Sequence, residues 1–98
     1  MTVSKHVAGD GFVLVDFYAD WCEPCKWVEP IVEEVVKNFD GKITLHKIDI
    51  DMQPKIARER LIFSVPTLVL YKDGEEIWRM RGFDTAQVLI KTFKGLIS

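Results

Sequence analysis

Hydrophobic positions change their spacing several times along the 98-residue chain, and each change predicts a new structural element. Residues 12–18 are apolar or aromatic at every position except Asp16, which is typical of a strand buried on both faces of a sheet. Over residues 24–38 apolar side chains recur every three or four positions, so this segment is predicted as an amphipathic helix. Pro30 lies within it and predicts a kink near the preceding turn.

The second half of the chain contains shorter periodic segments. Residues 42–49 are rich in β-branched side chains and are predicted as a strand, whereas residues 54–60 begin with a proline and are predicted as a short helix. Residues 65–71 and 76–81 are predicted as two further strands, joined by the turn dipeptide Asp73-Gly74.

A last helix is expected near the C-terminal end, where Asp84 with Gln87 three residues later resembles a capping box. The order β-α-β-α-β-β-α predicts one α/β domain over residues 1–98, with a four-stranded mixed sheet and helices on both faces. The expected order of strands across the sheet is 42–49, 12–18, 65–71 and 76–81.

Composition places the chain among folded globular proteins, since hydrophobic residues make up 48% of it, charged residues 29%, and the formal net charge is −2. Such a charge gives no basis for binding nucleic acid or an anionic membrane. Residues 1–6 lack the apolar core of a signal peptide, and no apolar run reaches the length of a membrane span. We therefore expect a monomeric cytoplasmic protein without nucleic-acid or membrane partners.

Both cysteines lie in one hexapeptide, residues 21–26, with the sequence Trp-Cys-Glu-Pro-Cys-Lys. Two thiols at this spacing, between a strand and a helix, are typical of reversible disulfide chemistry. Unpaired N–H groups and the helix dipole favour a thiolate at Cys22, and Pro24 suits a first turn because it has no N–H to leave unpaired. Cys22 is therefore expected to be the nucleophile at the exposed end of the helix, and Cys25, one turn in and better buried, the resolving thiol.

Asp16 is the candidate base for Cys25. A carboxylate among apolar residues of a central strand should have a raised pKa, which suits proton transfer near neutral pH. The alternative is a structural acid satisfied by hydrogen bonds, and the nearby cysteine pair favours the catalytic role.

A zinc site is a second possible use of the cysteines. Such a site needs four ligands, and only His6 and His46 are available as nitrogen ligands. Neither histidine has metal-ligand spacing to the cysteines, so we expect no metal and no other cofactor.

The chain resembles the thioredoxin family from about residue 12 to residue 96. The motifs that carry this resemblance are Val15-Asp16-Phe17, the hexapeptide at 21–26, Pro30, Lys47-x-Asp49-x-Asp51, Val65-Pro66-Thr67 and Gly82. The resemblance implies a thioredoxin-like fold and a protein-disulfide reductase that cycles between dithiol and disulfide. It also implies disulfide-containing proteins as substrates and a thioredoxin reductase as electron donor.

The resemblance implies roles for individual residues as well. Asp16 takes the position of the family's buried catalytic acid and Lys47 that of a lysine close to it, although Lys47 could equally be an ordinary surface lysine. Pro66 corresponds to the family's cis-proline, and the backbone of Val65 to the segment that pairs with substrate like an added strand. The expected substrate-binding residues are Trp21, Glu23, Pro24, Val65, Pro66 and Gly82.

Several features depart from the family pattern. Glutamate and serine replace two common glycines, and larger side chains flank the last glycine of the docking surface; these residues are Glu23, Ser64, Arg81 and Phe83. All lie around Cys22, so they bear on partner choice and redox poise. About eleven residues precede the first strand, too few for the β-α unit that most thioredoxins carry there, so residues 42–49 are expected to form an unpaired edge.

Two alternatives to a general dithiol donor stay open on the sequence alone. A disulfide oxidase or isomerase would differ in reduction potential rather than in residues, and the missing signal peptide disfavours it. A thioredoxin-fold binding or subunit module would carry incidental cysteines, which the joint presence of Asp16, both cysteines and Pro66 disfavours.

Overall fold

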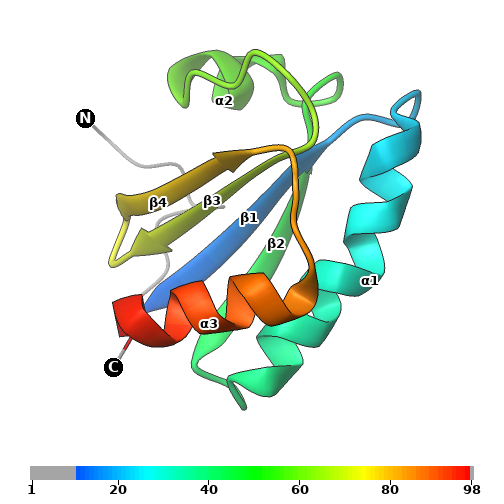
Figure 1. Cartoon of the computed structure of the whole chain (residues 1–98). Coiled ribbons are helices and arrows are strands. Elements are labelled where there is room, and N and C mark those ends of the chain that lie inside the picture. Colours follow the sequence, from blue (N-terminus) through cyan, green and yellow to red (C-terminus); the bar gives the residue numbers. More distant parts are fainter. Residues whose placement is uncertain (1–10, 98) are drawn as a thin grey trace.

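The computed structural model describes residues 11–97, which form a four-stranded sheet flanked by helices (Figure 1). In chain order the elements are β1 (Phe12–Tyr18), α1 (Glu23–Asn38), β2 (Ile43–Asp49), α2 (Pro54–Glu59), β3 (Thr67–Lys72), β4 (Glu75–Arg81) and α3 (Ala86–Ile97). The predicted element order is confirmed, and the ends of the elements lie within two residues of the prediction. Within residues 11–97, no helix combines the length and apolar character needed to cross a membrane.

The strand order across the sheet is β2-β1-β3-β4, as predicted. β1 runs parallel to β2 and antiparallel to β3, and β3 pairs with β4 through a tight hairpin. Asp73 and Gly74 form its turn with positive φ angles of 50° and 88°, the backbone that this dipeptide favours. β2 is an edge strand of the described sheet, while β1 lies between two neighbours and supplies the buried centre.

The two faces of the sheet carry separate hydrophobic cores, because successive side chains of a strand point to opposite faces. On one face Leu14 packs in a cluster with Val32 of α1 and Phe93 of α3. On the other face Val15 packs in a cluster with Ala57 of α2. The helices therefore cover both faces, as predicted (Figure 1). Asp16 is on the same face as Leu14, so it is directed toward the side that α1 covers.

β3 begins at Thr67, two residues later than predicted. Pro66 lacks the N–H that a strand residue donates, so it precedes the ladder instead of joining it. The Val65–Pro66 bond is cis, which confirms what the resemblance implied. The hydroxyl of Thr67 donates to the carbonyl of Ser64 at 2.7 Å, and the amide of Gly82 donates to the carbonyl of Pro66 at 2.8 Å.

The start of α3 differs from the predicted capping box, which is wrong in its capping residue. The hydroxyl of Thr85 accepts a hydrogen bond from the amide of Val88 at 3.2 Å, and its carbonyl accepts from the amide of Leu89 at 3.1 Å. Asp84 instead accepts from the amide of Thr85 at 2.7 Å. Threonine and aspartate both cap helices well, so the sequence does not show which of two adjacent residues is the cap. The backbone conformation at the start of the helix decides it.

α1 extends without interruption from Glu23 to Asn38 and includes Pro30. The kink near Pro30 stays a prediction.

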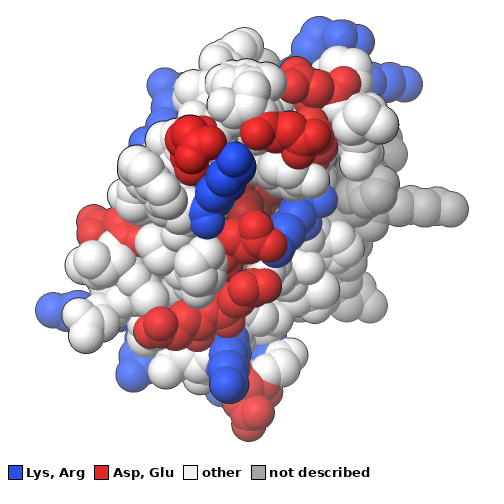
Figure 2. Space-filling model, turned by 90° about the vertical axis from the view of Figure 1, so that its right-hand side faces the viewer, with Lys and Arg blue, Asp and Glu red and all other residues white. Residues whose placement is uncertain are grey.

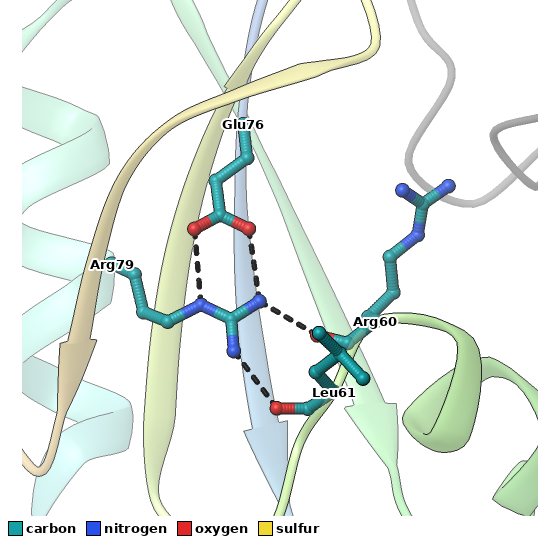
Figure 3. A network of polar contacts seen from close by, with 4 residues as sticks. All are labelled: Arg60, Leu61, Glu76 and Arg79. Atoms are coloured by element: carbon teal, nitrogen blue, oxygen red, sulfur yellow. Dashed lines mark hydrogen bonds and ion pairs between the residues drawn. The ribbon is translucent and has the colours of Figure 1, made fainter. Parts of the chain in front are cut away.

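A polar network ties the end of α2 to β4 (Figure 3). The guanidinium of Arg79 donates to both carboxylate oxygens of Glu76, at 3.1 and 2.9 Å. It also donates to the carbonyl oxygens of Arg60 at 2.6 Å and Leu61 at 2.9 Å. Carbonyls at a helix C-terminus lack intrahelical partners, so Arg79 caps α2 from the neighbouring strand. We call Arg60, Leu61, Glu76 and Arg79 the Arg79 network.

Candidate active site

The two cysteines lie at the N-terminus of α1 and form a disulfide, with their Cα atoms 5.3 Å apart. Cys22 is the N-cap residue, and Cys25 lies in the first turn. The amide of Cys25 donates to the Sγ atom of Cys22 at 3.3 Å, so a helix-terminal N–H is directed at this sulfur. An N–H in this position is the kind of donor that favours negative charge on a sulfur at a helix N-terminus.

The sequence predicted that Cys22 is more exposed than Cys25, and this prediction is wrong for the disulfide form. Cys22 is 4% exposed and Cys25 is 5% exposed. Both pack in a small cluster with Ala19, against which Val65 is placed. The chain turns from β1 into α1 at this point, and the contacts of the turn cover Cys22 as well as the residue one turn further in. Helix position, rather than burial, distinguishes the two sulfurs.

Three residues assigned to substrate binding from the resemblance lie together beside the disulfide. Val65 packs against the cysteine cluster, and the buried Pro66 follows it. Gly82 is hydrogen-bonded to Pro66 and has a φ of +110°, a conformation that favours glycine. Nothing lies within 4 Å of the position that a Cβ of Gly82 would take, so this backbone is open to a docking chain.

Trp21 is highly exposed, at 69%, and yet it is held in place. Its indole N–H donates to a carboxylate oxygen of Asp51 at 2.8 Å. Asp51 follows β2, where its amide donates to the side chain of Asp49 at 2.9 Å. The indole next to Cys22 is thus hydrogen-bonded to the loop that follows β2, and its role in substrate binding stays a prediction.

Glu23 and Pro24 form the first turn of α1 between the cysteines. The carboxylate of Glu23 pairs with the ammonium of Lys26 at 2.9 Å, and both side chains are largely in solvent. The hydrogen bond with Glu23 raises the pKa of Lys26. A lysine therefore balances part of the negative charge that Glu23 places next to Cys22.

Asp16 is 2% exposed, and its Oδ1 atom has no hydrogen-bond partner among the described residues. Burial raises the pKa of Asp16 from 3.8 to about 6, against the opposing effect of the Lys47 charge and with a smaller raising effect from Glu29. The predicted direction of the pKa shift and its cause are therefore supported. An Asp that forms no hydrogen bond at a buried oxygen does not fit the alternative of a satisfied structural acid.

A cleft of about 260 Å³ opens between β1, β2 and α1 and brings Asp16 and Cys25 to the same space. Its lining residues are Asp16, Tyr18, Ala19, Asp20, Cys25, Lys26, Glu29 and Lys47. We call it the Asp16 cleft. The carboxyl group of Asp16 and the cysteine one turn inside the helix therefore border the same space.

Lys47 lies in register with Asp16 on the neighbouring strand and lines the cleft, so it is close to Asp16, as the resemblance implied. Its ammonium, however, pairs with Glu29 of α1 at 2.7 Å and lies 3.7 Å from Glu33. Glu29 was not identified from the sequence. It follows Cys25 by four residues, a spacing that places two side chains on one helix face, and this signal could have revealed it.

The residues that depart from the family pattern lie on the surface around the disulfide. Phe83 is exposed and meets the exposed Trp27 edge-on, with ring centroids 6.3 Å apart. Ser64 and Arg81 are exposed as well. Trp78, by contrast, packs edge-on against Phe93 at 4.9 Å in the core of the α3 face.

Within residues 11–97, no three His, Cys, Asp or Glu side chains gather in a way that could hold a metal ion. His46 is half-buried on β2. His6, the other histidine considered for zinc, lies outside the described residues.

The cysteine pair at a strand–helix junction, the cis-proline beside it and the buried carboxyl group in the cleft define a thiol–disulfide exchange protein of mixed α/β fold. A family model described as Thioredoxin matches residues 2–95. Thioredoxins from Staphylococcus saprophyticus and Staphylococcus epidermidis are 39% identical over 84 residues and 42% identical over 79 residues. These matches cover 86% of this chain and 81% of the first relative, and 81% of this chain and 76% of the second.

A solved structure of a mutant thioredoxin from Halobacterium salinarum NRC-1 has a TM-score of 0.84 to this chain at 33% identity. The similarity covers 95% of this chain and 80% of that one. The chain therefore belongs to the thioredoxin family. It is a thiol–disulfide oxidoreductase of the thioredoxin type, which reduces protein disulfides by dithiol–disulfide exchange through Cys22 and Cys25.

Proposed function

We propose that Cys22 is the attacking thiol and Cys25 the resolving thiol of this exchange. The observation that carries the assignment is the N-cap position of Cys22, where the amide of Cys25 faces its sulfur. The Cys22 thiolate attacks one sulfur of the substrate disulfide, a mixed disulfide forms, and the other substrate sulfur leaves as a thiolate that takes a proton from solvent. The substrate is then bound through a single S–S bond to the N-terminus of α1.

In the second step the Cys25 thiol loses its proton and its thiolate attacks the Cys22 sulfur. The Cys22–Cys25 bond forms, the bond to the substrate breaks, and the second substrate sulfur leaves as a thiol or thiolate. The substrate gains two electrons and the protein dithiol becomes a disulfide. We assign Asp16 as the acceptor of the Cys25 proton, because both line the Asp16 cleft and burial raises the pKa of Asp16 to about 6.

Lys47 supports this role through its positive charge, because that charge favours the carboxylate form of Asp16, which is the form that can accept a proton. The substrate chain is proposed to bind along Val65, Pro66 and Gly82, with Trp21 as one wall and the first turn of α1 (Glu23 and Pro24) as the other. The open backbone at Gly82 and the contact of Val65 with the cysteine cluster support this path.

The proposal extends to the surroundings of the protein. Residues 1–98 act as a single domain, which the family match over residues 2–95 supports. The domain works as a cytoplasmic monomer, and a thioredoxin reductase returns it to the dithiol form. The two cysteines of the chain are both used in the redox pair, as expected where structural disulfides do not form.

Insulin reduction by the Cys22→Ser and Cys25→Ser variants tests the assignment. Each reduced variant is incubated with insulin and analysed by mass spectrometry without reductant. Cys25→Ser should accumulate a mixed disulfide with an insulin chain, because it can attack but not resolve. Cys22→Ser should form no such adduct, and both variants should reduce insulin at the uncatalysed rate.

An adduct on Cys22→Ser together with none on Cys25→Ser reverses the roles of the two thiols. A wild-type protein that reduces insulin no faster than the uncatalysed rate would instead point to a binding module with incidental cysteines. Thermal unfolding of the oxidised wild type and of both serine variants shows whether each variant is folded under the assay conditions.

A further inference from the structure

The charges at the mouth of the Asp16 cleft are arranged differently from what strand register alone suggests. Asp16 and Lys47 are direct neighbours on β1 and β2, and both line the cleft. A buried carboxylate next to a lysine would ordinarily take the ammonium as its partner. Here the ammonium of Lys47 is 2.7 Å from Glu29, while Oδ1 of Asp16 has no hydrogen-bond partner among residues 11–97.

α1 supplies the competing carboxylates. Cys25, Glu29 and Glu33 follow one another at intervals of four residues, so they lie along one face of the helix above β2. Glu29 lines the cleft together with Cys25, whereas Glu33 is not part of the lining and lies 3.7 Å from Lys47. Figure 2 shows the side of the molecule that carries α1, where acidic side chains gather along the middle and basic side chains lie among them.

We propose that Glu29 is a positioning residue that holds the Lys47 ammonium at the mouth of the cleft and thereby keeps Asp16 a stronger proton acceptor. Two effects act in the same direction. Glu29 withdraws the one positive charge that could pair with Asp16 from the neighbouring strand, and its own negative charge disfavours ionisation of Asp16. The proton acceptor for Cys25 is thus adjusted by a residue one helical turn beyond Cys25. This inference rests on the proposed role of Asp16 only for its consequence in turnover.

Other charged and titratable groups also face Asp16 from the elements around it. Tyr18 follows it on β1, Asp20 lies in the connection to α1, and Lys26 extends from the first turns of α1. The hydrogen bond of Lys26 goes to Glu23, away from the cleft. The charges of Lys47 and Glu29 act on the pKa of Asp16 in opposite directions, with Lys47 lowering it and Glu29 raising it.

The test follows the carboxyl carbon of Asp16 by NMR during a pH titration of the oxidised full-length protein. Glu29→Gln should lower the midpoint of this titration by about half a pH unit or more, since it removes a nearby charge and loosens the hold on Lys47. Glu33→Gln is the matched control from the same helix face and should move the midpoint less. Lys47→Met should raise it.

The double variant Glu29→Gln/Lys47→Met separates the two effects. If Glu29 acts in part by holding Lys47, its substitution must shift the midpoint less in the Lys47→Met protein than in the wild type. A midpoint unchanged by Glu29→Gln, an equal shift from Glu33→Gln, or the same Glu29→Gln shift with and without Lys47 would overturn the inference.

The pH dependence of insulin reduction by Glu29→Gln distinguishes this inference from the proposed function. A parallel shift of the rate profile toward lower pH supports both. A shifted Asp16 titration with an unshifted rate profile upholds the effect of Glu29 and contradicts the assignment of Asp16 as the proton acceptor.

Discussion

The Asp16 cleft and the Arg79 network place charged groups against opposite faces of the same sheet, and they differ in how those charges are satisfied. Arg79 has a carboxylate and two backbone carbonyls as acceptors, all within 3.1 Å. Asp16 is more deeply buried, and one of its oxygens has no partner among residues 11–97. A satisfied charge contributes to stability, whereas an unsatisfied buried one lowers it and holds its proton more tightly.

The paired charges of the Arg79 network and the incompletely paired charge of the Asp16 cleft lie at positions that suit different purposes. The Arg79 network lies between β4 and the end of α2, from which the chain continues to Val65 and Pro66. Its bonds therefore brace the segment that flanks the disulfide. Cys25 of the disulfide lines the Asp16 cleft, and a fully paired carboxylate there would have a lower pKa, so it would be a weaker acceptor for the proton that we propose Cys25 releases. Stability and reactivity are thus assigned to different faces of one small domain.

The largest effect is expected from Asp16→Asn, which removes the unsatisfied charge. The folded pKa of about 6 lies above the unfolded value of 3.8, so ionisation of Asp16 opposes folding. The penalty is absent below the unfolded pKa, grows as the pH rises from about 4 to 6, and levels off above the folded pKa. At roughly 1.4 kcal/mol per pKa unit, the variant should be about 3 kcal/mol more stable at pH 7.

Denaturant unfolding of wild type and Asp16→Asn at pH 7 and pH 4 measures this. The gain should fall to about 0.5 kcal/mol at pH 4, and the variant should reduce insulin more slowly at pH 7. A variant that is less stable at pH 7 would mean that Asp16 is a paired structural acid, which would remove the contrast with Arg79.

Arg79→Met should have the opposite effect on stability. It keeps most of the aliphatic stem and removes the donors, which leaves the carbonyls at the end of α2 and the Glu76 carboxylate without their partner. The expected loss is about 2 kcal/mol, since hydrogen bonds of a charged group contribute more than neutral ones. Denaturant unfolding measures the loss.

Arg58→Met, at an exposed position of α2, is the control and should change the stability by less than about 0.5 kcal/mol. Insulin reduction per folded molecule should stay close to wild type in both variants. If Arg79→Met shifted the pH profile of insulin reduction, the two regions would not be independent.

The smallest effect is expected at the exposed pair of Glu23 and Lys26, which lies near the disulfide but in solvent. Glu23→Gln should lower the pKa of the reduced Cys22 thiol and Lys26→Gln should raise it, each by less than about half a pH unit because water and salt screen exposed charges. Titration of the thiolate absorbance at low and high ionic strength measures both. Curves that superimpose for all three proteins would show that Glu23 acts only on the shape of the docking surface.

Some of the site could be identified from the sequence because it depends on local patterns. The spacing of the cysteines, the apolar run around Asp16 and the proline of the Val-Pro-Thr segment are each contained in a few consecutive residues. The partner of Lys47 could not be identified in this way, because Glu29 lies 18 residues earlier in the chain and meets it only through the packing of α1 on β2. The capping residue of α3 was predicted wrongly for a different reason, because the adjacent residues Asp84 and Thr85 both carry good capping groups.

What the sequence by itself determined is the order of elements, the order of strands and the position of the disulfide pair, because hydrophobic periodicity and short motifs specify which segments are buried and where each one ends. The tertiary structure alone decided which charges meet. It directed Lys47 to Glu29 instead of Asp16, buried both cysteines to a similar extent, and placed Arg79 on the carbonyls at the end of α2. The physical reason is that the energy of a charged side chain depends on distances of a few ångströms between segments remote in the chain, and these distances exist only after the two cores have packed.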